Sequence, residues 1–170
     1  MIKHSPTAFA FNAFLENIVI VSNAGILYDS IIFFLEEYPE RLVEMLEKIQ
    51  HKLDLSKTVE VIKRTGYIAL IEEFLQKAQP QNNAAVNEAL NALYLEKQDY
   101  KSLRKSIEGY GQFASGELAY NLENHELTDC RRISALLYRK DKKYKKSLDI
   151  SIHDSQFKDA METVAESRDP

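Results

Sequence analysis

The segment YKKSLDISIHDSQFKDAM, residues 144–161, contains one short pattern twice. In each copy an aromatic residue is followed by a small residue three positions later and by an apolar residue four positions later. The aromatic residues are Tyr144 and Phe157, and the residues that follow them are Ser147 with Leu148 and Ala160 with Met161. Residues three and four apart share one face of a helix. The pattern therefore predicts two successive short helices that pack in the same way.

The same aromatic spacing begins at Tyr28 and at Tyr67. We expect each ring to fill space against a neighbouring helix, and each small residue to let the next helix approach closely. A chain that reuses one packing solution favours a solenoid, because each helix then meets mainly its neighbours. An irregular helical bundle is the alternative, since aromatic and aliphatic residues at helical spacing occur in any helical core.

Helical signals continue along the chain, which has only five glycines and four prolines. We expect roughly ten helices of about 8–15 residues joined by very short links. One apolar face, in PERLVEMLEKI, consists of Leu42, Val43, Leu46 and Ile49. NIVIV, residues 17–21, is interpreted as buried helix rather than strand. The expected N-caps are Ser56, either Thr128 or Asp129, and Asp154. Gly66 is expected to end a helix. The last helix is expected to bury Phe157, Ala160, Met161 and Val164.

The composition is that of a globular domain. The 170 residues are 45% hydrophobic and 28% charged, with a formal net charge of −4. This acidic balance argues against general nucleic-acid binding, which needs a basic field. The single cysteine, Cys130, lies in a helical pattern and is expected to be a packed thiol. The apolar runs are too short for a membrane span, so we expect a cytosolic protein in one domain.

No pattern of catalytic or metal-ligating residues stands out. The four histidines are scattered, at positions 4, 51, 125 and 153. HELTD, residues 125–129, starts like a zinc-protease motif but lacks the second histidine, so His125 is expected at a turn with a local hydrogen bond. EGYGQFASG is interpreted as a turn between helices. We therefore expect no enzymatic activity, no cofactor and no metal; a helical enzyme with converging carboxylates is the alternative.

The most distinctive polar feature is RKDKKYKK, residues 139–146, with six basic residues among eight. One hypothesis is a surface for an anionic partner. The alternative is a solvated loop whose cations favour the preceding helix C-terminus through the helix dipole. Arg131 and Arg132 point about 100° apart on one helix. One of them is expected to cap carbonyl groups or to pair with Glu123 or Glu126.

The second half of the chain resembles the clathrin heavy chains, in the last part of their proximal leg. The resemblance is carried by an ordered series of segments: VNEALN, DYKSLRKSI, LENHEL followed by RRISALL, DSQFKDAM and AESRD. Upstream, FFLEEYP and LDLSKTVEVI fit the same register. The likeness covers residues 26–169.

This resemblance implies an all-α fold, a right-handed α-solenoid of short antiparallel helix pairs, with residues 1–170 forming a single segment of a longer leg. It also implies a structural role in the lattice of coated vesicles, on the cytoplasmic face of coated pits. The implied partners are the clathrin light chain and the legs of neighbouring heavy chains. The fragment by itself is expected to be a monomer or to associate weakly. A vacuolar-sorting tether subunit with clathrin-like repeats is the alternative.

The sequence also departs from the family pattern. The metazoan-like members of the family have a tryptophan and lysines near the stretch that matches TAFAFNAFLEN, and one of these lysines is expected to meet acidic residues of the light chain. This chain has Phe9, Ala10 and Leu15 there. A family tryptophan is likewise replaced by Tyr144. The candidate partner-binding residues are Lys142, Lys143, Lys145, Lys146, Phe9 and Leu15.

Overall fold

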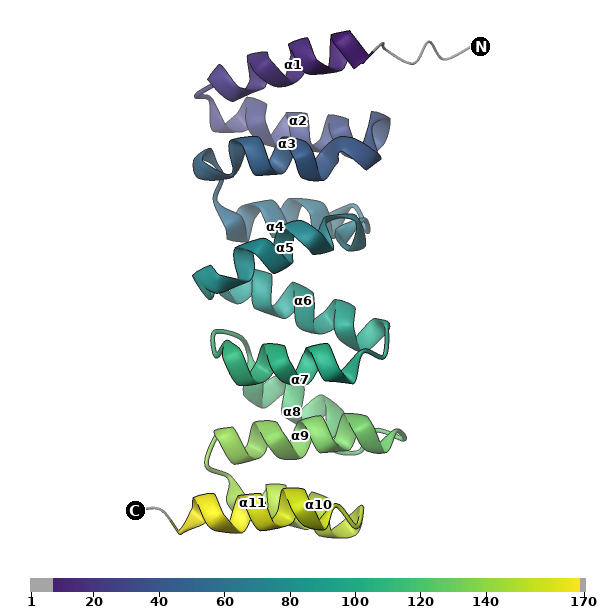
Figure 1. Ribbon diagram of the computed structural model, residues 1–170, viewed down its shortest axis with the longest axis vertical. Helices are drawn as coiled ribbons and strands as arrows, with labels where there is room; N and C mark the ends of the chain where they lie inside the picture. The colour runs from purple at the N-terminus through teal and green to yellow at the C-terminus, as the bar shows by residue number, and fades with distance from the viewer. Residues whose placement is uncertain (1–7, 169–170) are drawn as a thin grey trace. The chain divides into compact units, whose positions relative to one another are not determined.

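The computed structural model describes residues 8–168, in which eleven α-helices, four short 3-10 helices and no strand occur. The prediction of an all-α fold is confirmed. Contacts divide the chain into two compact units, residues 1–89 and 90–170. In each unit successive helices run back and forth, so that their links fall alternately on two sides (Figure 1).

The first unit is built from five helices and the start of a sixth. Their bounds are α1 Ala8–Ile20, α2 Ala24–Glu37, α3 Leu42–Ile49, α4 Leu55–Arg64, α5 Glu72–Ala78 and α6 Ala84–Glu96. The four 3-10 helices lie between them, at Pro39–Arg41, Gln50–Lys52, Ile68–Ile71 and Gln79–Gln81. Helix α3 packs against α1, α2 and α5, and α2 also packs against α4. Each helix therefore meets the next helix or the one after it.

The core of the first unit follows the predicted apolar faces. Leu42, Leu46 and Ile49 of α3 are fully buried. The NIVIV segment is helical to Ile20, as expected, and Ile18 is buried whereas Ile20 is largely exposed. Burial of these short stripes is the main source of stability, because isolated helices of this length are marginal in water.

One predicted cap in this unit is wrong. The N-cap of α4 is Asp54, whose carboxylate accepts a hydrogen bond from the Lys57 backbone N–H at 2.8 Å. Ser56 lies inside the helix, and its hydroxyl instead meets Asn83. The helix stops as expected before Gly66, which has a φ of 79°.

The second unit contains the end of α6 and the five helices α7 Tyr100–Gly109, α8 Ser115–Leu122, α9 Thr128–Lys140, α10 Tyr144–His153 and α11 Phe157–Ser167. Helix α9 packs against α7, α8 and α10, and α10 packs against α11. The EGYGQFASG segment forms the α7–α8 link, as predicted. Ile133, Leu136 and Leu137 of α9 are buried, also as predicted.

Three links in this unit share one backbone geometry. A residue in the left-handed region, Gln98, Lys142 or Ser155, follows the end of a helix with a φ of 55°, 59° or 56°. The next residue donates its N–H to the carbonyl five positions back, at 2.7–2.8 Å in all three cases. This is the Schellman arrangement, which satisfies the last carbonyls of a helix.

An aromatic residue follows each of these turns as the first residue of the next helix, namely Tyr100, Tyr144 and Phe157. The repeated pattern in residues 144–161 therefore marks a repeated turn as well as a repeated packing face. The small residues behave as predicted, because Ser147 is 1% exposed and Ala160 is buried. The Ser147 hydroxyl lies 3.1 Å from that of Thr163, which brings α10 and α11 close together.

The expected role of the aromatic rings is confirmed for Tyr28 and is wrong for Tyr67 and Phe157, whereas Tyr144 is half-buried. Tyr28 is buried, and its hydroxyl accepts a hydrogen bond from the Asp54 N–H. Tyr67 and Phe157 are 54% and 64% exposed, and Met161 is exposed as well. Helical spacing placed these residues on one face, but only the neighbouring helices decide which face is covered.

The two N-caps predicted in the second unit are also wrong. Helix α9 starts at Thr128 after Leu127, which makes no side-chain cap bond. Asp154 ends α10 rather than starting α11, whose N-cap position is Gln156.

The packing of each unit is that of an α-solenoid, because helices meet their neighbours in sequence order rather than around a shared centre. The predicted fold class is thus confirmed over the irregular bundle. The hand of the superhelix and the single 1–170 domain stay predictions.

The repeated turn gives a first testable prediction. A side chain at positive φ costs about 1–2 kcal/mol, and glycine avoids this cost while losing some backbone entropy. Ser155→Gly and Gln98→Gly should therefore each raise the free energy of unfolding by about 0.5–1 kcal/mol in urea titrations. Lys105→Gly, inside the exposed face of α7, is the control and should lower it by about 1 kcal/mol. A loss of stability in the two turn variants would contradict the turn's role.

Candidate functional site

The basic segment, residues 139–146, spans the end of α9, the link and the first turn of α10. Arg139 and Lys140 lie in the last turn of α9, where cations interact favourably with the helix dipole. Lys145 and Lys146 lie in the first turn of α10, where the same dipole disfavours a positive charge. The dipole explanation therefore accounts for the first two cations and not for the last two.

Two of the six basic residues hold the fold together. Arg139 is 9% exposed and pairs with Glu162 at 2.8 Å and with Glu166 at 3.4 Å, both on α11. Lys140 donates from its ammonium group to the carbonyls of Ile107 and Glu108, at the end of α7. These contacts link α9 to α11 and to α7, so neither cation is free for a partner.

Lys146 and Lys143 are partly engaged. The Lys146 ammonium donates to Glu123 at 3.2 Å and lies over the Tyr138 ring, while Lys143 is within 3.8 Å of Asp141. Hydrogen bonds from Tyr138 and Lys146 lower the pKa of Glu123. Burial and the Glu123 carboxylate raise the pKa of Tyr138. The bonds to Tyr138 and Glu123 raise the pKa of Lys146, so it stays charged.

The other two lysines, Lys142 and Lys145, are exposed. Neither makes an ion pair or a side-chain hydrogen bond with any residue in the 8–168 range. An open hollow of about 420 Å³ is lined by residues 142–146. Of the predicted partner-binding lysines, these two are the most available to a partner, because their ammonium groups are exposed and unpaired in the described structure.

The two apolar candidates fare differently. The side chain of Phe9 lies outside the described residues. Leu15 is 1% exposed and belongs to the core of the first unit. It is therefore not available at the surface of this structure. The candidate partner surface therefore consists of the lysines.

Arg131 ties the α8–α9 link to the end of α10. It donates to the carbonyls of His125 and Glu126 at 2.6 and 2.8 Å, which confirms the expected carbonyl cap. It also makes a bidentate ion pair with Asp154, in which Nε donates to Oδ2 at 2.7 Å and Nη2 donates to Oδ1 at 2.9 Å. The Arg131 guanidinium lowers the pKa of Asp154, a carboxylate whose side chain is only 4% exposed. Sequence reasoning missed this partner because Asp154 was interpreted as an N-cap.

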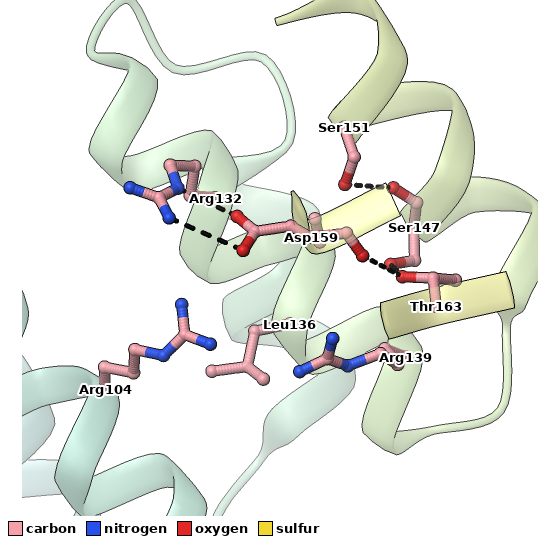
Figure 2. A pocket seen from close by; sticks show the side chains of 9 residues that line it. Arg104, Arg132, Leu136, Arg139, Ser147, Ser151, Asp159 and Thr163 are labelled. Atoms are coloured by element: carbon pink, nitrogen blue, oxygen red, sulfur yellow. Dashed lines mark hydrogen bonds and ion pairs between the residues drawn. The ribbon is translucent and has the colours of Figure 1, made fainter. Parts of the chain in front are cut away.

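The neighbouring Arg132 also pairs across helices, with Asp159 of α11 at 2.9 Å. Figure 2 shows Arg132 and Arg139 of α9 together with Arg104 of α7 around a small hollow, with Leu136 between them. The hydroxyls of Ser147 and Thr163 close its far side. The hollow measures about 10 Å³, which is space for about one water molecule. It is a packing defect between paired charges rather than a ligand site.

A larger hollow of about 490 Å³ lies beside the C-terminal part of α10, and we call it the α8–α10 hollow. It is lined by Glu123, Asn124, His125, Glu126, Arg131, Asp149, Ile150 and His153. The carboxylates of Glu126 and Asp149 make no ion pair with other described side chains. The hollow is open to solvent and rimmed by acidic groups.

Other sequence interpretations can be located as well. His125 lies at the predicted turn, and its Nδ1 accepts a hydrogen bond from the Leu127 N–H at 3.1 Å. Cys130 is buried, as expected, with its sulfur 3.7 Å from the Tyr100 hydroxyl. No cluster of three potential metal ligands occurs within residues 8–168. No helix in the described part of the chain has the length and apolar character to cross a membrane.

The Arg131–Asp154 pair gives a testable prediction. Asp154→Asn should lower the free energy of unfolding at pH 7 by about 2–4 kcal/mol, because a largely buried guanidinium loses its charged partner. The folded-state pKa of Asp154 is depressed. Its stabilisation is therefore present above the unfolded value near 3.8 and is lost as pH falls through the folded value.

Urea titrations between pH 7 and pH 3 should accordingly show a shallower loss of stability in Asp154→Asn than in the unchanged chain. The control is Glu108→Gln, which removes an exposed pair with Arg104 on one helix and should cost less than about 0.5 kcal/mol. Equal effects of the two substitutions at pH 7 would contradict the role given to Asp154.

Residues 46–170 match the model of the Clathrin family, described as "Region in Clathrin and VPS". The chain is 39% identical to the clathrin heavy chain of Dictyostelium discoideum over 170 residues, which is all of this chain and 10% of that protein. It is 39% identical to the clathrin heavy chain of Drosophila melanogaster over 167 residues, 98% of this chain and 10% of the relative.

A plant relative, clathrin heavy chain 1 of Arabidopsis thaliana, is 35% identical over 169 residues, which are 99% of this chain and 10% of that protein. The chain thus spans about a tenth of the length of these relatives. The likeness runs through both compact units, and helices packed in sequence order are what a repeat of this kind requires. The chain belongs to the Clathrin family, and it is a repeat segment of the clathrin heavy-chain type.

Proposed function

We propose that this chain is a structural segment of a clathrin heavy-chain leg and that its function is mechanical rather than catalytic. The observation that carries the proposal is the similarity to clathrin heavy chains along essentially the whole chain. The helix packing agrees with it. In this role the folded helices form part of a structural leg. The length and stiffness of the leg set the geometry of a coat on the cytoplasmic face of coated vesicles.

Ion pairs between alternate helices suit a load-bearing segment. Arg132 and Arg139 hold α9 to α11, and Lys146 holds α10 to Glu123 at the end of α8. The last four helices are thus connected by ion pairs as well as by apolar burial. Small changes at each interface can add up to bending of the leg without any single contact breaking.

The exposed lysines support a role in binding an anionic partner. Lys142 and Lys143 lie in the α9–α10 link, next to a helix start where anions are favoured. The partner that we propose is the clathrin light chain, through an acidic helix. Surface charge of this kind contributes more to association rate and register than to affinity.

Two other functions have less support. The family description also names VPS proteins, but the relatives compared above are clathrin heavy chains. A helical enzyme would need converging titratable groups in a deep pocket. The hollows described in the second unit are either open to solvent or about the size of one water molecule.

Light-chain binding tests the proposal. The chain should capture purified light chain from the same source in a low-salt pull-down. Lys142→Glu combined with Lys143→Glu should weaken this binding about tenfold, because two favourable charges become repulsive. The matched control combines Lys63→Glu and Lys105→Glu, which change the net charge equally on exposed positions elsewhere, and should bind normally.

The pull-down distinguishes the role of the two lysines from the light-chain-binding role of the whole segment. Unchanged affinity in the Lys142 and Lys143 variant would remove these lysines from the partner surface. Failure of the unchanged chain to capture any light chain would contradict the assignment of this segment as a light-chain-binding part of the leg.

A further inference from the structure

Five consecutive residues at the start of α10 surround one open hollow on the surface of the second unit. The hollow measures about 420 Å³ and is lined by Lys142, Lys143, Tyr144, Lys145 and Lys146. We call it the lysine hollow. Its four lysines are exposed, and its tyrosine is half-buried. Sites for small molecules have volumes of about 300–1,000 Å³, so the lysine hollow is large enough for a compact ligand.

Positive charge exceeds negative charge around the lysine hollow. Asp141 and Glu123 are the two carboxylates beside it, at 3.8 and 3.2 Å from lysine ammonium groups. Each of them also accepts a hydrogen bond from a hydroxyl group, Asp141 from Ser115 and Glu123 from Tyr138. The four lysines therefore have only two carboxylate partners among the described side chains, and both partners are shared.

The helix start at the lysine hollow lacks the anionic cap that two other helices have. The residue before α4 is Asp54 and the residue before α7 is Asp99, and each carboxylate accepts the N–H of the third helical residue, at 2.8 and 3.0 Å. Before α10 this position is Lys143, which makes no side-chain cap bond, and the first turn has no acidic residue. The first N–H groups of a helix have no intrahelical partner and favour an anion. An external anion can therefore take the place that a carboxylate has at α4 and α7.

Phosphate groups fit this combination of lysines and a helix start. A phosphate monoester carries a charge of about −1.5 to −2 at neutral pH and has three acceptor oxygens. Lysine binds phosphate as a point charge, and the N–H groups at a helix start bind phosphate oxygens. Several phosphates on one small molecule can contact several ammonium groups at once. A compact ligand of this kind matches both the charge and the size of the lysine hollow.

We propose that the lysine hollow is a binding site for a ligand that carries several phosphate groups on a compact scaffold. Its phosphates contact Lys142 and Lys145, whose ammonium groups are exposed and unpaired in the described structure, and the first N–H groups of α10. Lys143 and Lys146 add positive charge beside them. The ligand is either a soluble molecule or the headgroup of a lipid, because both present the same phosphate chemistry.

Binding of this ligand has a consequence for the light chain. Lys142 and Lys143 are also the lysines proposed to contact an acidic helix, so the two anions need the same positive charges. The phosphate ligand should therefore displace the light chain. This consequence rests on the proposed function, whereas phosphate binding itself does not.

Isothermal titration calorimetry with inositol hexakisphosphate tests the proposal. At about 0.1 M salt, where the screening length is about 10 Å, this chain should bind the probe with one-to-one stoichiometry. Lys142→Glu combined with Lys145→Glu should raise the Kd about tenfold or more, because two attractive charges become repulsive. The matched control combines Lys63→Glu and Lys105→Glu, which change the net charge equally at exposed positions elsewhere, and should leave the Kd unchanged.

Two further measurements separate a phosphate site from a general attraction between charges. Citrate, a small polycarboxylate, should bind at least about tenfold more weakly than the probe, because it has no phosphate groups. Lys143→Asp places a carboxylate where α4 and α7 have Asp54 and Asp99. This variant should weaken probe binding and also raise the urea midpoint of unfolding, because the new carboxylate occupies the helix start itself. Lys143→Gln should not raise the midpoint.

Vesicles distinguish the two sources of the phosphates. If the ligand is a lipid headgroup, the chain should sediment with phosphatidylcholine vesicles that contain phosphatidylinositol bisphosphate, and the Lys142 and Lys145 variant should not. If the ligand is soluble, the chain should bind inositol hexakisphosphate and leave these vesicles unbound. Vesicles with the same total charge from phosphatidylserine are the control and should not bind the chain.

Several results would overturn the proposal. They are the absence of binding at about 1 mM probe, an equal loss of affinity in the two double variants, an equal affinity for citrate, and equal sedimentation with phosphatidylserine vesicles. A captured light chain that stays bound in saturating probe would contradict the displacement alone. The titration contains no light chain, so failure of phosphate binding and failure of the proposed light-chain role are distinguishable.

Discussion

Short helices that cannot stand alone are the constraint on which this structure depends. The helices are 7–14 residues long, and isolated helices of this length are marginal in water. Each helix becomes stable only by covering its apolar stripe with the next helix and the one after it. Close approach of these neighbours is therefore essential, and it explains the small buried residues between α10 and α11, Ser147 and Thr163.

Reuse of one turn follows from the same constraint. The links after α6, α9 and α10 each satisfy the carbonyls of the finished helix through a left-handed residue, and then start a new helix two residues later. None of the three uses glycine, although glycine would adopt this backbone at lower cost. The three left-handed residues are of different types, and their side chains are polar and exposed. What the three links share is their backbone geometry.

Ion pairs connect the helices of the second unit in addition to apolar burial. Three cross-helix pairs, Glu123 with Lys146, Arg131 with Asp154 and Arg139 with Glu162, are each separated by 23 residues. This separation carries the chain from one helix to the end of the next or to the helix after it. These pairs connect α8 to α10 and α9 to the end of α10 and to α11, which suits a segment whose function is to hold a shape.

The same distribution of charge separates the fold from the contact surfaces. Within RKDKKYKK, Arg139 and Lys140 are bound within the second unit, whereas Lys142 and Lys145 are exposed and unpaired in the described structure. Residues that form one basic run in the sequence therefore have two different roles in the structure. One part stabilises the helices, and the other is available for partners.

Much of the fold was predictable from the sequence, because helical periodicity and the shortage of glycine and proline are local properties. The resemblance to clathrin heavy chains was also evident from ordered segments such as VNEALN and DSQFKDAM, and the comparisons confirmed the family. Cys130 as a packed thiol and His125 at a turn were correct for the same reason, since both depend on nearby residues.

Only the tertiary structure decided which faces are covered and which charges are paired. Phe157 and Met161 have the spacing of core residues but are exposed, and Asp154 has the appearance of an N-cap but closes a pair with Arg131. Sequence fixes the angle of a side chain around its helix. Burial and pairing depend on another helix placed there by the fold, from a part of the chain that local spacing does not specify.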